Sequence, residues 1–318
     1  QPTKSEIQKV CRTLINGNAD CKKRILLKDL IFLFLDENKE ELNPNTIRYK
    51  KIHLNHFIST IGVNKIVLDL NEDLLLQYRR TLISQRRENT TSNCYIKSVK
   101  SFLNWLNKKK FLDQKLSTCI TKLKEVKKDI ITLTDDEIQI LQNSSLEPYL
   151  QKQIDVFLFG CYTALSISDM KRIRKNMIID NSIKIRRNKT EKILSIPIIY
   201  EASEILEKYN YVLPCISDNK GNENLKEAFR ILNLNRKVRI SRKYNKDNAQ
   251  DQFVPLYSVI SWHKSRKTAI TSAIKKGIPH PIVMQLTGHT KFETMKKYIE
   301  VVDQDLKKEM SKLNYGGN

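Results

Sequence analysis

Apolar residues recur at helical spacing in several stretches of this chain, and this periodicity constrains the fold more than any other feature. The clearest case carries Tyr95, Val99, Phe102, Leu103 and Leu106, at offsets of 4, 7, 8 and 11 residues. These offsets place all five side chains on one face of a helix. Gly and Pro, which interrupt helices, number only 8 each among 318 residues. The sequence therefore predicts a mainly helical protein.

The length of the chain indicates more than one domain, because 318 residues exceed what one core usually holds. Helical segments of this kind predict a helical first domain over residues 24–112. The polar, Lys-rich residues 113–130 are expected to be an interdomain linker, and residues 1–23 the remnant of an N-terminal region or a linker. Residues 131–318 are expected to form a second domain with a C-terminal tail.

The second domain is predicted to be helical with a small antiparallel β-sheet. Its first helix is expected to begin at Thr134, which precedes Glu137 by three residues as in a capping box. Residues 178–198 alternate apolar and polar side chains at period two and contain two turns, which predicts antiparallel strands. Leu306, Met310 and Leu313 predict a last amphipathic helix, which could pack on its own protomer or on a neighbour.

The charge of the chain is strongly positive. Lys and Arg number 57 against 35 Asp and Glu, a net charge of +22. Such a field attracts polyanions, so nucleic acid is the favoured partner and an acidic membrane surface the alternative. No apolar run is long enough to span a bilayer, so we expect no membrane insertion. The six cysteines form no C-x-x-C pair, which predicts reduced thiols in the cytoplasm, with neither a zinc site nor disulfides.

Four short motifs in the second domain carry candidate chemistry. Lys189 lies in a predicted turn, His263 and Arg266 form H-x-x-R at the start of a predicted helix, His289 ends the run L-T-G-H, and Tyr298 lies nine residues further on. Taken singly, H-x-x-R is usually a surface pair, a lysine in a turn is usually solvated, and a glycine before histidine usually ends a helix. Their combined order and spacing point to one site.

These residue types suit the chemistry of the tyrosine recombinases, whose motifs the four runs resemble and whose reaction is the transfer of a DNA strand to a tyrosine. The attacked phosphodiester gains negative charge, which an arginine binds with a fixed, permanently charged fork. One preorganised donor of this kind contributes about 2.7–4 kcal/mol. A histidine can accept the phenol proton, since a free phenol has a pKa of about 10. A lysine can protonate the leaving 5′-oxygen. No clustered acidic motif suggests a metal nuclease, so we expect neither a metal nor a cofactor.

The four motifs together resemble the catalytic signature of the tyrosine recombinases, the lambda-integrase-like family. His263 to Arg266 resembles the family's H-x-x-R, the run ending at His289 its L-x-G-H, and the run ending at Tyr298 its nucleophile segment. Asn-Lys-Thr around Lys189 is similar to the β-hairpin that bears the catalytic lysine.

The resemblance covers residues 24–318, because the helical first domain is similar to the family's core-binding domain. It implies a two-domain DNA clamp made of a core-binding and a catalytic domain. It also implies a site-specific recombinase that cuts and rejoins DNA through a 3′-phosphotyrosine on Tyr298. The freed 5′-hydroxyl of a partner strand then reverses the attack, so ATP is not required.

One position departs from the family pattern. The family carries an arginine in T-G-L-R, whereas this chain reads T-A-L-S with Ser166 in its place. A neutral hydroxyl cannot replace a bidentate cation. Arg187, two residues before Lys189 and so on the same strand face, is our first candidate for the missing cation, followed by Arg172 and Arg174. A phosphate-backbone contact away from the scissile bond is the alternative role for Arg187.

In lacking this arginine, the chain also resembles the integrases of Bacteroides-type conjugative transposons. That resemblance implies the integrase of a mobile element, which usually carries an N-terminal arm-binding domain. A DNA invertase or a chromosome-dimer resolvase would use the same chemistry at other sites. A catalytically dead, sequence-specific DNA-binding protein is the alternative of a different class, and only Ser166 supports it.

The partners implied by the resemblance are double-stranded DNA carrying recombination sites, further copies of the chain up to a tetramer on paired sites, and accessory DNA-bending proteins. Most of the affinity should come from phosphate contacts and so should weaken with salt. The candidate contacts in the first domain, for which a solvated helix face is the alternative, are Arg48, Lys51, Asn93, Lys97 and Lys100.

Overall fold

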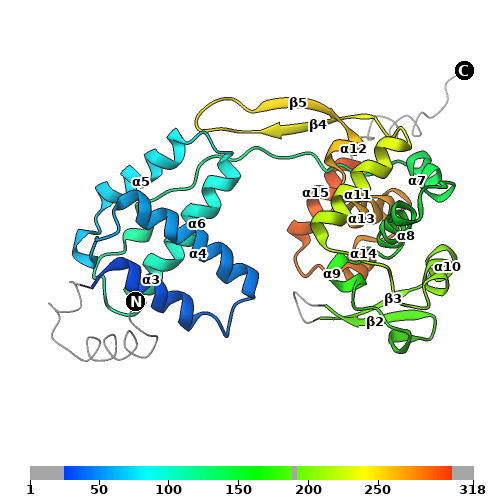
Figure 1. Ribbon diagram of the computed structural model, residues 1–318, viewed down its shortest axis with the longest axis horizontal. Coiled ribbons are helices and arrows are strands. Elements are labelled where there is room, and N and C mark those ends of the chain that lie inside the picture. Colours follow the sequence, from blue (N-terminus) through cyan, green and yellow to red (C-terminus); the bar gives the residue numbers. More distant parts are fainter. Residues whose placement is uncertain (1–24, 188–191, 303–318) are drawn as a thin grey trace, which may run out of the picture. The chain divides into compact units, whose positions relative to one another are not determined.

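The computed structural model describes residues 25–187 and 192–302. These residues form two compact units, as the chain length indicated. The first unit consists of the chain up to Lys127 together with Ser241–Asp251, and the second of Lys128–Ile240 and the chain from Gln252 onward. Both units are built mainly from helices, with small antiparallel sheets (Figure 1), which confirms the predicted fold class.

The first unit begins its helices where the sequence indicates. Asn43 accepts a hydrogen bond from the amide of Asn45 and precedes a proline, so it caps the second helix. Asn71 accepts from the amide of Leu74 and caps the third. The helices of this unit are α3 (Leu27–Glu37), α4 (Pro44–Ile61), α5 (Glu72–Ser84) and α6 (Asn89–Lys108), with 3-10 turns η1 (Val67–Asp69) and η2 (Leu116–Thr118).

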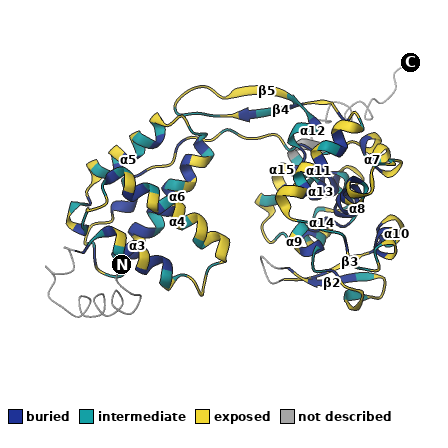
Figure 2. Cartoon of the chain, in the orientation of Figure 1, coloured by how far each residue is buried: buried dark blue, intermediate teal, exposed yellow. Residues whose placement is uncertain are grey.

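The core of the first unit is formed by the apolar faces of these helices, which point inward (Figure 2). Val99, Phe102, Leu103 and Leu106 of α6 are fully buried, as their spacing predicts, while Tyr95 packs at the edge of the core. Burying side chains of this size stabilises a fold by about 1.5–3 kcal/mol each.

The stretch expected to be a linker differs from that expectation. Up to Lys127 it belongs to the first unit, where Leu116, Ile120 and Leu123 are buried in the core. These apolar side chains are spaced widely among lysines, so the polar composition of residues 113–130 concealed them. The N-terminal residues 1–23 and the predicted helix around Leu306 lie outside the described residues.

The second unit is organised around a buried helix, α8, which packs against α7, α10, α11 and α13. Thr134 and Glu137 form the predicted capping box at the start of α7. The helices are α7 (Asp135–Gln142), α8 (Pro148–Thr163), α9 (Ile167–Met170), α10 (Tyr200–Lys208), α11 (Asp218–Ile231), α12 (Leu256–Val259), α13 (Trp262–Lys275), α14 (His280–Thr287) and α15 (Phe292–Val302), with the 3-10 turn η3 (Lys175–Met177).

A three-stranded antiparallel sheet lies at one edge of the second unit, formed by β1 (Ile178–Ile179), β2 (Ser182–Arg186) and β3 (Ile193–Pro197). It confirms the antiparallel sheet that the alternating pattern predicted. Ile183 pairs with Ile196 and Ile185 with Leu194, and all four side chains are buried.

A second hairpin, β4 (Lys237–Arg242) with β5 (Gln250–Pro255), was not predicted from the sequence. Its strands carry mostly charged and polar side chains, and only Val238 and Ser241 are buried, so the apolar alternation that marks a strand is missing. The segment Ser241–Asp251 belongs to the first unit, where the Asn89 side chain bonds both the amide and the carbonyl of Asn245.

Candidate active site

Tyr298 lies in a small apolar cluster between α13 and α15. It packs with Ile270 and Ile274 of α13, Val283 of α14 and Met295, one turn earlier on α15. The residue is only 2% exposed. Burial raises the pKa of its phenol, whereas the charge of Arg266 acts in the opposite direction. The apolar faces of two helices therefore bring the predicted nucleophile beside the predicted arginine.

Two buried guanidinium groups converge on a single carbonyl group. Arg266, in the first turns of α13, donates one hydrogen bond to the carbonyl of Ala164 and another of 2.6 Å to the carbonyl of Thr287. Arg187, directly after β2, donates to the same Thr287 carbonyl at 2.7 Å. Burial, followed by the charge of Arg187, lowers the pKa of Arg266 to about 10. Two adjacent cations in a buried position attract an anion.

Asp169 connects Arg187 to the position of the missing arginine. Its Oδ2 accepts from the hydroxyl of Ser166 at 2.6 Å and pairs with Nε of Arg187 at 3.4 Å, and its Oδ1 accepts from Arg172 at 2.9 Å. Its side chain is 2% exposed. No role was predicted for Asp169 from the sequence, although an acidic residue three positions after Ser166 was a visible signal.

Gly288 directly follows Thr287, whose carbonyl accepts from both arginines. It ends α14 with φ +66°, a left-handed conformation that glycine adopts without strain. A Cβ atom at this position would lie 3.1 Å from Cδ of Arg187 and 3.1 Å from Cδ2 of Leu194. The glycine in L-T-G-H therefore ends the helix and also leaves room for Arg187.

Both histidines of the motifs lie near Arg266, and His289 also lies beside Tyr298. The His289 ring centroid is 6.4 Å from that of Tyr298, and its Nδ1 bonds the hydroxyl of Thr287 at 2.9 Å. Desolvation, followed by the charge of Arg266, lowers the pKa of His289 to about 4. His263 reaches solvent, but desolvation and then the charge of Lys267 lower its pKa to about 4 as well. Both imidazoles are therefore neutral at pH 7 and able to accept a proton.

Arg186 and Arg187 lie on opposite faces of the strand end, as the alternation of a strand requires. Arg186 is exposed, and Arg187 is 9% exposed. Lys189, the predicted catalytic lysine, lies outside the described residues. The other candidate cations, Arg172 and Arg174, make hydrogen bonds to Asp169 and to nearby backbone carbonyl groups.

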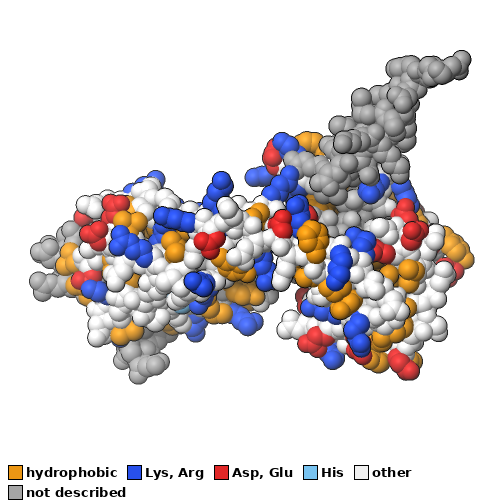
Figure 3. Space-filling model, turned by 90° about the horizontal axis from the view of Figure 1, so that it is seen from above, with side chains coloured by type: hydrophobic (Ala, Val, Ile, Leu, Met, Phe, Trp, Pro, Cys, Tyr) orange, Lys and Arg blue, Asp and Glu red, His pale blue; other side chains and the backbone are white. Residues whose placement is uncertain are grey.

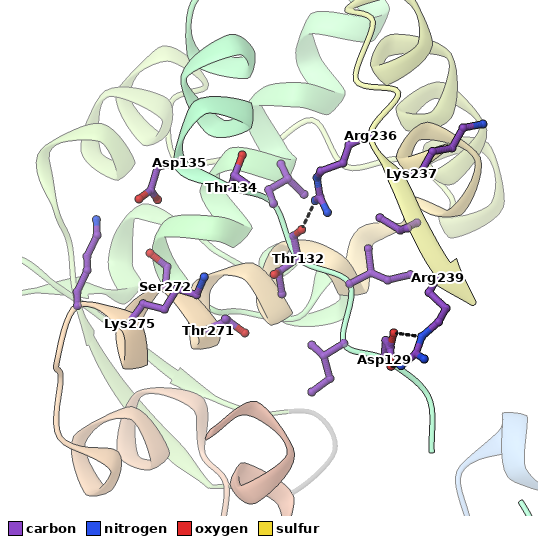
Figure 4. A pocket seen from close by; sticks show the side chains of 15 residues that line it. Asp129, Thr132, Thr134, Asp135, Arg236, Lys237, Arg239, Thr271, Ser272 and Lys275 are labelled. Atoms are coloured by element: carbon purple, nitrogen blue, oxygen red, sulfur yellow. Dashed lines mark hydrogen bonds and ion pairs between the residues drawn. The ribbon is translucent and has the colours of Figure 1, made fainter. Parts of the chain in front are cut away.

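A separate pocket of about 620 Å³ in the second unit contains none of these residues. It lies beside residues 129–134, which precede α7, and between β4 and α13 (Figure 4). Arg239 pairs with Asp129 at its rim, and Arg236 donates to the carbonyl of Thr132. Within the described part of the chain, no group of three or more His, Cys, Asp or Glu side chains could hold a metal ion.

The candidate DNA contacts of the first unit divide into two groups. Arg48 and Lys51 of α4 and Lys97 of α6 are exposed, and Lys100 is half-buried. Asn93 is buried, and its side chain bonds both the amide and the carbonyl of Leu123. The prediction of a DNA contact for Asn93 is therefore wrong, because this asparagine lies on the core-facing side of α6 and holds the chain after η2.

Lys and Arg side chains are spread over both units on the face seen in Figure 3. None of the helices described is long and apolar enough to cross a membrane. Cys94, Cys119, Cys161 and Cys215 are free thiols.

Comparison with known proteins agrees with this geometry. Residues 131–305, which hold all the motif residues, match the phage integrase family. A tyrosine recombinase of Thermosipho africanus is 24% identical over 272 residues, 83% of this chain and 91% of its own length. A tyrosine recombinase of Pseudothermotoga lettingae is 26% identical over 255 residues, 78% of this chain and 85% of its own length.

Solved structures share the fold at low sequence identity. A lambda integrase dimer bound to a COC′ core site aligns with a TM-score of 0.67 and 12% identity, over 92% of this chain and 86% of that one. The Tn1549 transposon integrase in complex with circular intermediate DNA aligns with a TM-score of 0.59 and 12% identity, over 86% and 95%. The family match covers more than half of the 318 residues of this chain, so the chain belongs to the phage integrase family and is a tyrosine recombinase.

Proposed function

We propose that Tyr298 is the nucleophile of this recombinase and that Arg266 and Arg187 bind the scissile phosphate. The observation that carries the proposal is the convergence of both guanidinium groups on the Thr287 carbonyl, beside the buried Tyr298. A phosphate oxygen accepts the remaining N–H donors of such groups and compensates their charge. The tyrosine oxygen then forms a bond to phosphorus, the bond from phosphorus to the 5′-oxygen breaks, and a 3′-phosphotyrosine results.

Proton transfer in this scheme uses groups around Tyr298. His263 and His289, which are neutral at pH 7, are assigned the role of accepting the phenol proton or bonding a phosphate oxygen. The leaving 5′-oxygen takes its proton from Lys189, a role that rests on the family resemblance. In support, the Arg187 amide donates to the Lys192 carbonyl at 2.9 Å, so the β2–β3 pairing extends to Arg187, two residues before Lys189 in the sequence.

Arg187 is proposed to replace the arginine missing at Ser166. The Ser166 hydroxyl and Arg187 Nε share Oδ2 of Asp169, so the two side chains meet at one carboxylate. A guanidinium group reaching Asp169 from Arg187 therefore occupies the region that a side chain at position 166 would enter. A phosphate-backbone contact away from the scissile bond fits less well, because Arg187 is buried and shares its acceptor with Arg266.

The role of Arg187 is tested by cleavage of a nicked duplex under single-turnover conditions. Arg187→Ala should slow cleavage about 100-fold or more, the effect of removing one preorganised donor. Arg186→Ala is the matched control, since Arg186 is exposed one residue away. Ser166→Arg should restore part of the rate in the Arg187→Ala background. Full activity of Arg187→Ala would exclude the replacement.

The DNA substrate is proposed to be a pair of recombination sites at which the integrase of a mobile element joins and releases DNA. Support comes from the lambda integrase tetramer bound to a Holliday junction, which aligns with a TM-score of 0.65, and from the Tn1549 transposon integrase. By analogy, the chain would clamp duplex DNA between its two units, act as a tetramer and work with accessory DNA-bending proteins. Arg48, Lys51, Lys97 and Lys100 are the proposed phosphate contacts of the first unit.

The cytoplasm is the proposed compartment, in keeping with the free thiols. A relationship to Bacteroides-type conjugative transposons stays part of the proposal and rests on the serine at position 166. A DNA invertase or resolvase would use the same active site and would differ in the arrangement of its two DNA sites.

Covalent trapping tests whether the protein is active. The protein is mixed with a partly randomised pool of nicked duplexes, in which the released strand is lost and cleavage cannot reverse. A denaturant-stable adduct that is absent with Tyr298→Phe would support the proposal and give the site sequence. Salt-sensitive DNA binding without any adduct would favour the catalytically dead DNA-binding protein.

A further inference from the structure

Lys297 is a cation in the run that ends at Tyr298, and the motifs assign it no role. Its Nζ lies 5.1 Å from the centroid of the Tyr298 ring. A cation at this distance from an aromatic face is attracted by the electrons of the ring. If the phenol loses its proton the ring carries a full negative charge, and the attraction then becomes stronger.

The charge of Lys297 is not neutralised by a carboxylate. Among the residues that the structure describes, Lys297 forms neither an ion pair nor a hydrogen bond, and its side chain is exposed. The groups whose charges face Tyr298 and Lys297 come from α13, from the end of α14 and from the strand end after β2. They are His263, Arg266, Lys267, His289 and Arg187. All of these are basic groups. The carboxylates nearest in the described part of the chain are Asp169, which pairs with Arg187 and Arg172, and Glu293, which lies four residues before Lys297 on α15 without pairing with it.

Deprotonation of Tyr298 needs such help. Burial raises the pKa of this phenol above its ordinary value of 10.0, while the two neutral histidines have pKa values lowered to about 4. Transfer of the proton from this phenol to either imidazole is therefore strongly unfavourable unless the phenolate is stabilised. Arg266 and Arg187 are already bonded to the Thr287 carbonyl, and their proposed role is to bind the phosphate, so an additional cation beside the phenol ring has a distinct task.

We propose that Lys297 is a positioning residue that stabilises the phenolate form of Tyr298 and holds its ring for attack, while the two arginines bind the phosphate. This inference rests on the proposed role of Tyr298. It predicts that the positive charge at position 297 matters more than the shape of the side chain. Lys297→Arg should therefore behave like the wild type, and Lys297→Met, neutral and of similar length, should not.

The first test measures the acidity of Tyr298 without DNA. The protein is labelled with fluorotyrosine, whose phenol is more acidic than that of tyrosine, and its fluorine resonances are titrated with pH. The resonance of residue 298 is identified by its absence from Tyr298→Phe. Lys297→Met should raise the pKa of this residue and Lys297→Arg should restore it. An unchanged pKa in Lys297→Met would overturn the inference, whether or not the protein cleaves DNA.

The second test follows adduct formation on a nicked duplex as a function of pH. Lys297→Met should slow cleavage about tenfold near neutral pH, and the deficit should narrow as the pH rises and the phenolate forms without help. Lys296→Met is the matched control, since Lys296 is exposed and makes no described contact with the ring. A uniform loss at every pH, with weaker DNA binding and a smaller salt dependence, would identify Lys297 as a phosphate contact instead. Absence of any wild-type adduct would contradict the proposed function and leave the fluorine titration to decide the role of Lys297.

Discussion

Asp169→Asn is the perturbation whose effect follows most directly from the contacts of the site. The carboxylate is 2% exposed and accepts from Ser166, Arg172 and Arg187. Its neutralisation leaves the Arg187 guanidinium buried beside Arg266 without a counterion. Removing one partner of a buried pair costs about 3–5 kcal/mol. The Arg187 contact is long, at 3.4 Å, and asparagine keeps one acceptor oxygen. We therefore expect a loss of about 2–3 kcal/mol in the stability of the second unit.

A double-mutant cycle separates the charge effect from a packing defect. Arg187→Met removes the cation that Asp169→Asn leaves unpaired, so the double variant should lose about 1–2 kcal/mol less than the sum of the single variants. Urea unfolding can be followed in the second unit alone through Trp262, once Trp105 of the first unit is replaced by Phe, because the chain has only 2 tryptophans. Asp218→Asn, which breaks an exposed pair with Lys171, is the control and should cost under about 0.5 kcal/mol. Additive losses, or an Asp169→Asn variant as stable as this control, would refute the reasoning.

Other consequences concern DNA binding, pH and the glycine after α14. Lys97→Ala should reduce the slope of log affinity against log salt by about 1. Asn93→Ala should leave that slope unchanged but destabilise the first unit by about 1–3 kcal/mol, because the buried amide and carbonyl of Leu123 lose their hydrogen-bond partner. A changed slope would instead indicate that Asn93 contacts DNA. For His263 and His289 the pKa in the folded chain is about 4, below the ordinary histidine value of 6.5. Between these two values the unfolded chain therefore binds protons that the folded chain does not. The free energy of unfolding, measured with urea, should therefore decline as the pH falls from about 6.5 to about 4. The decline should be smaller in a variant with both histidines replaced by Gln, and the same decline in that variant and the wild type would contradict the lowered pKa values. Gly288→Ala should slow cleavage more than it weakens DNA binding, because its Cβ would press on Arg187; an unaltered cleavage rate would contradict the position assigned to that arginine.

Much of the candidate site could be predicted because its parts have side-chain signatures at fixed helical spacing. The apolar positions around Met295 and Ile270 bring α15 against α13, and so place Tyr298 near Arg266. The alternation along a strand puts Arg186 and Arg187 on opposite faces, and in the structure Arg187 is buried while Arg186 is exposed. In these cases a local pattern determines the direction of a side chain, and the direction decides which groups meet.

Other parts had no local signature. The Thr287 carbonyl, to which both arginines donate, is a backbone group that any residue could supply at that position. Asn93 was predicted to contact DNA, but the position of a residue on its helix decides which face it occupies, and Asn93 lies on the buried face of α6. The β4–β5 hairpin is charged on both faces and so lacks the apolar alternation of a buried strand.

The central claim, that Tyr298 becomes covalently joined to DNA, is tested most directly by locating the attached nucleotide. The adduct trapped on a nicked duplex is digested with nuclease and protease, and the peptide that carries the nucleotide remnant is identified by mass spectrometry. The chain has 12 tyrosines, so the position is informative. We predict a remnant on the peptide that contains Tyr298 and on no other tyrosine. A remnant on a different residue, or an adduct that persists in Tyr298→Phe, would contradict the account.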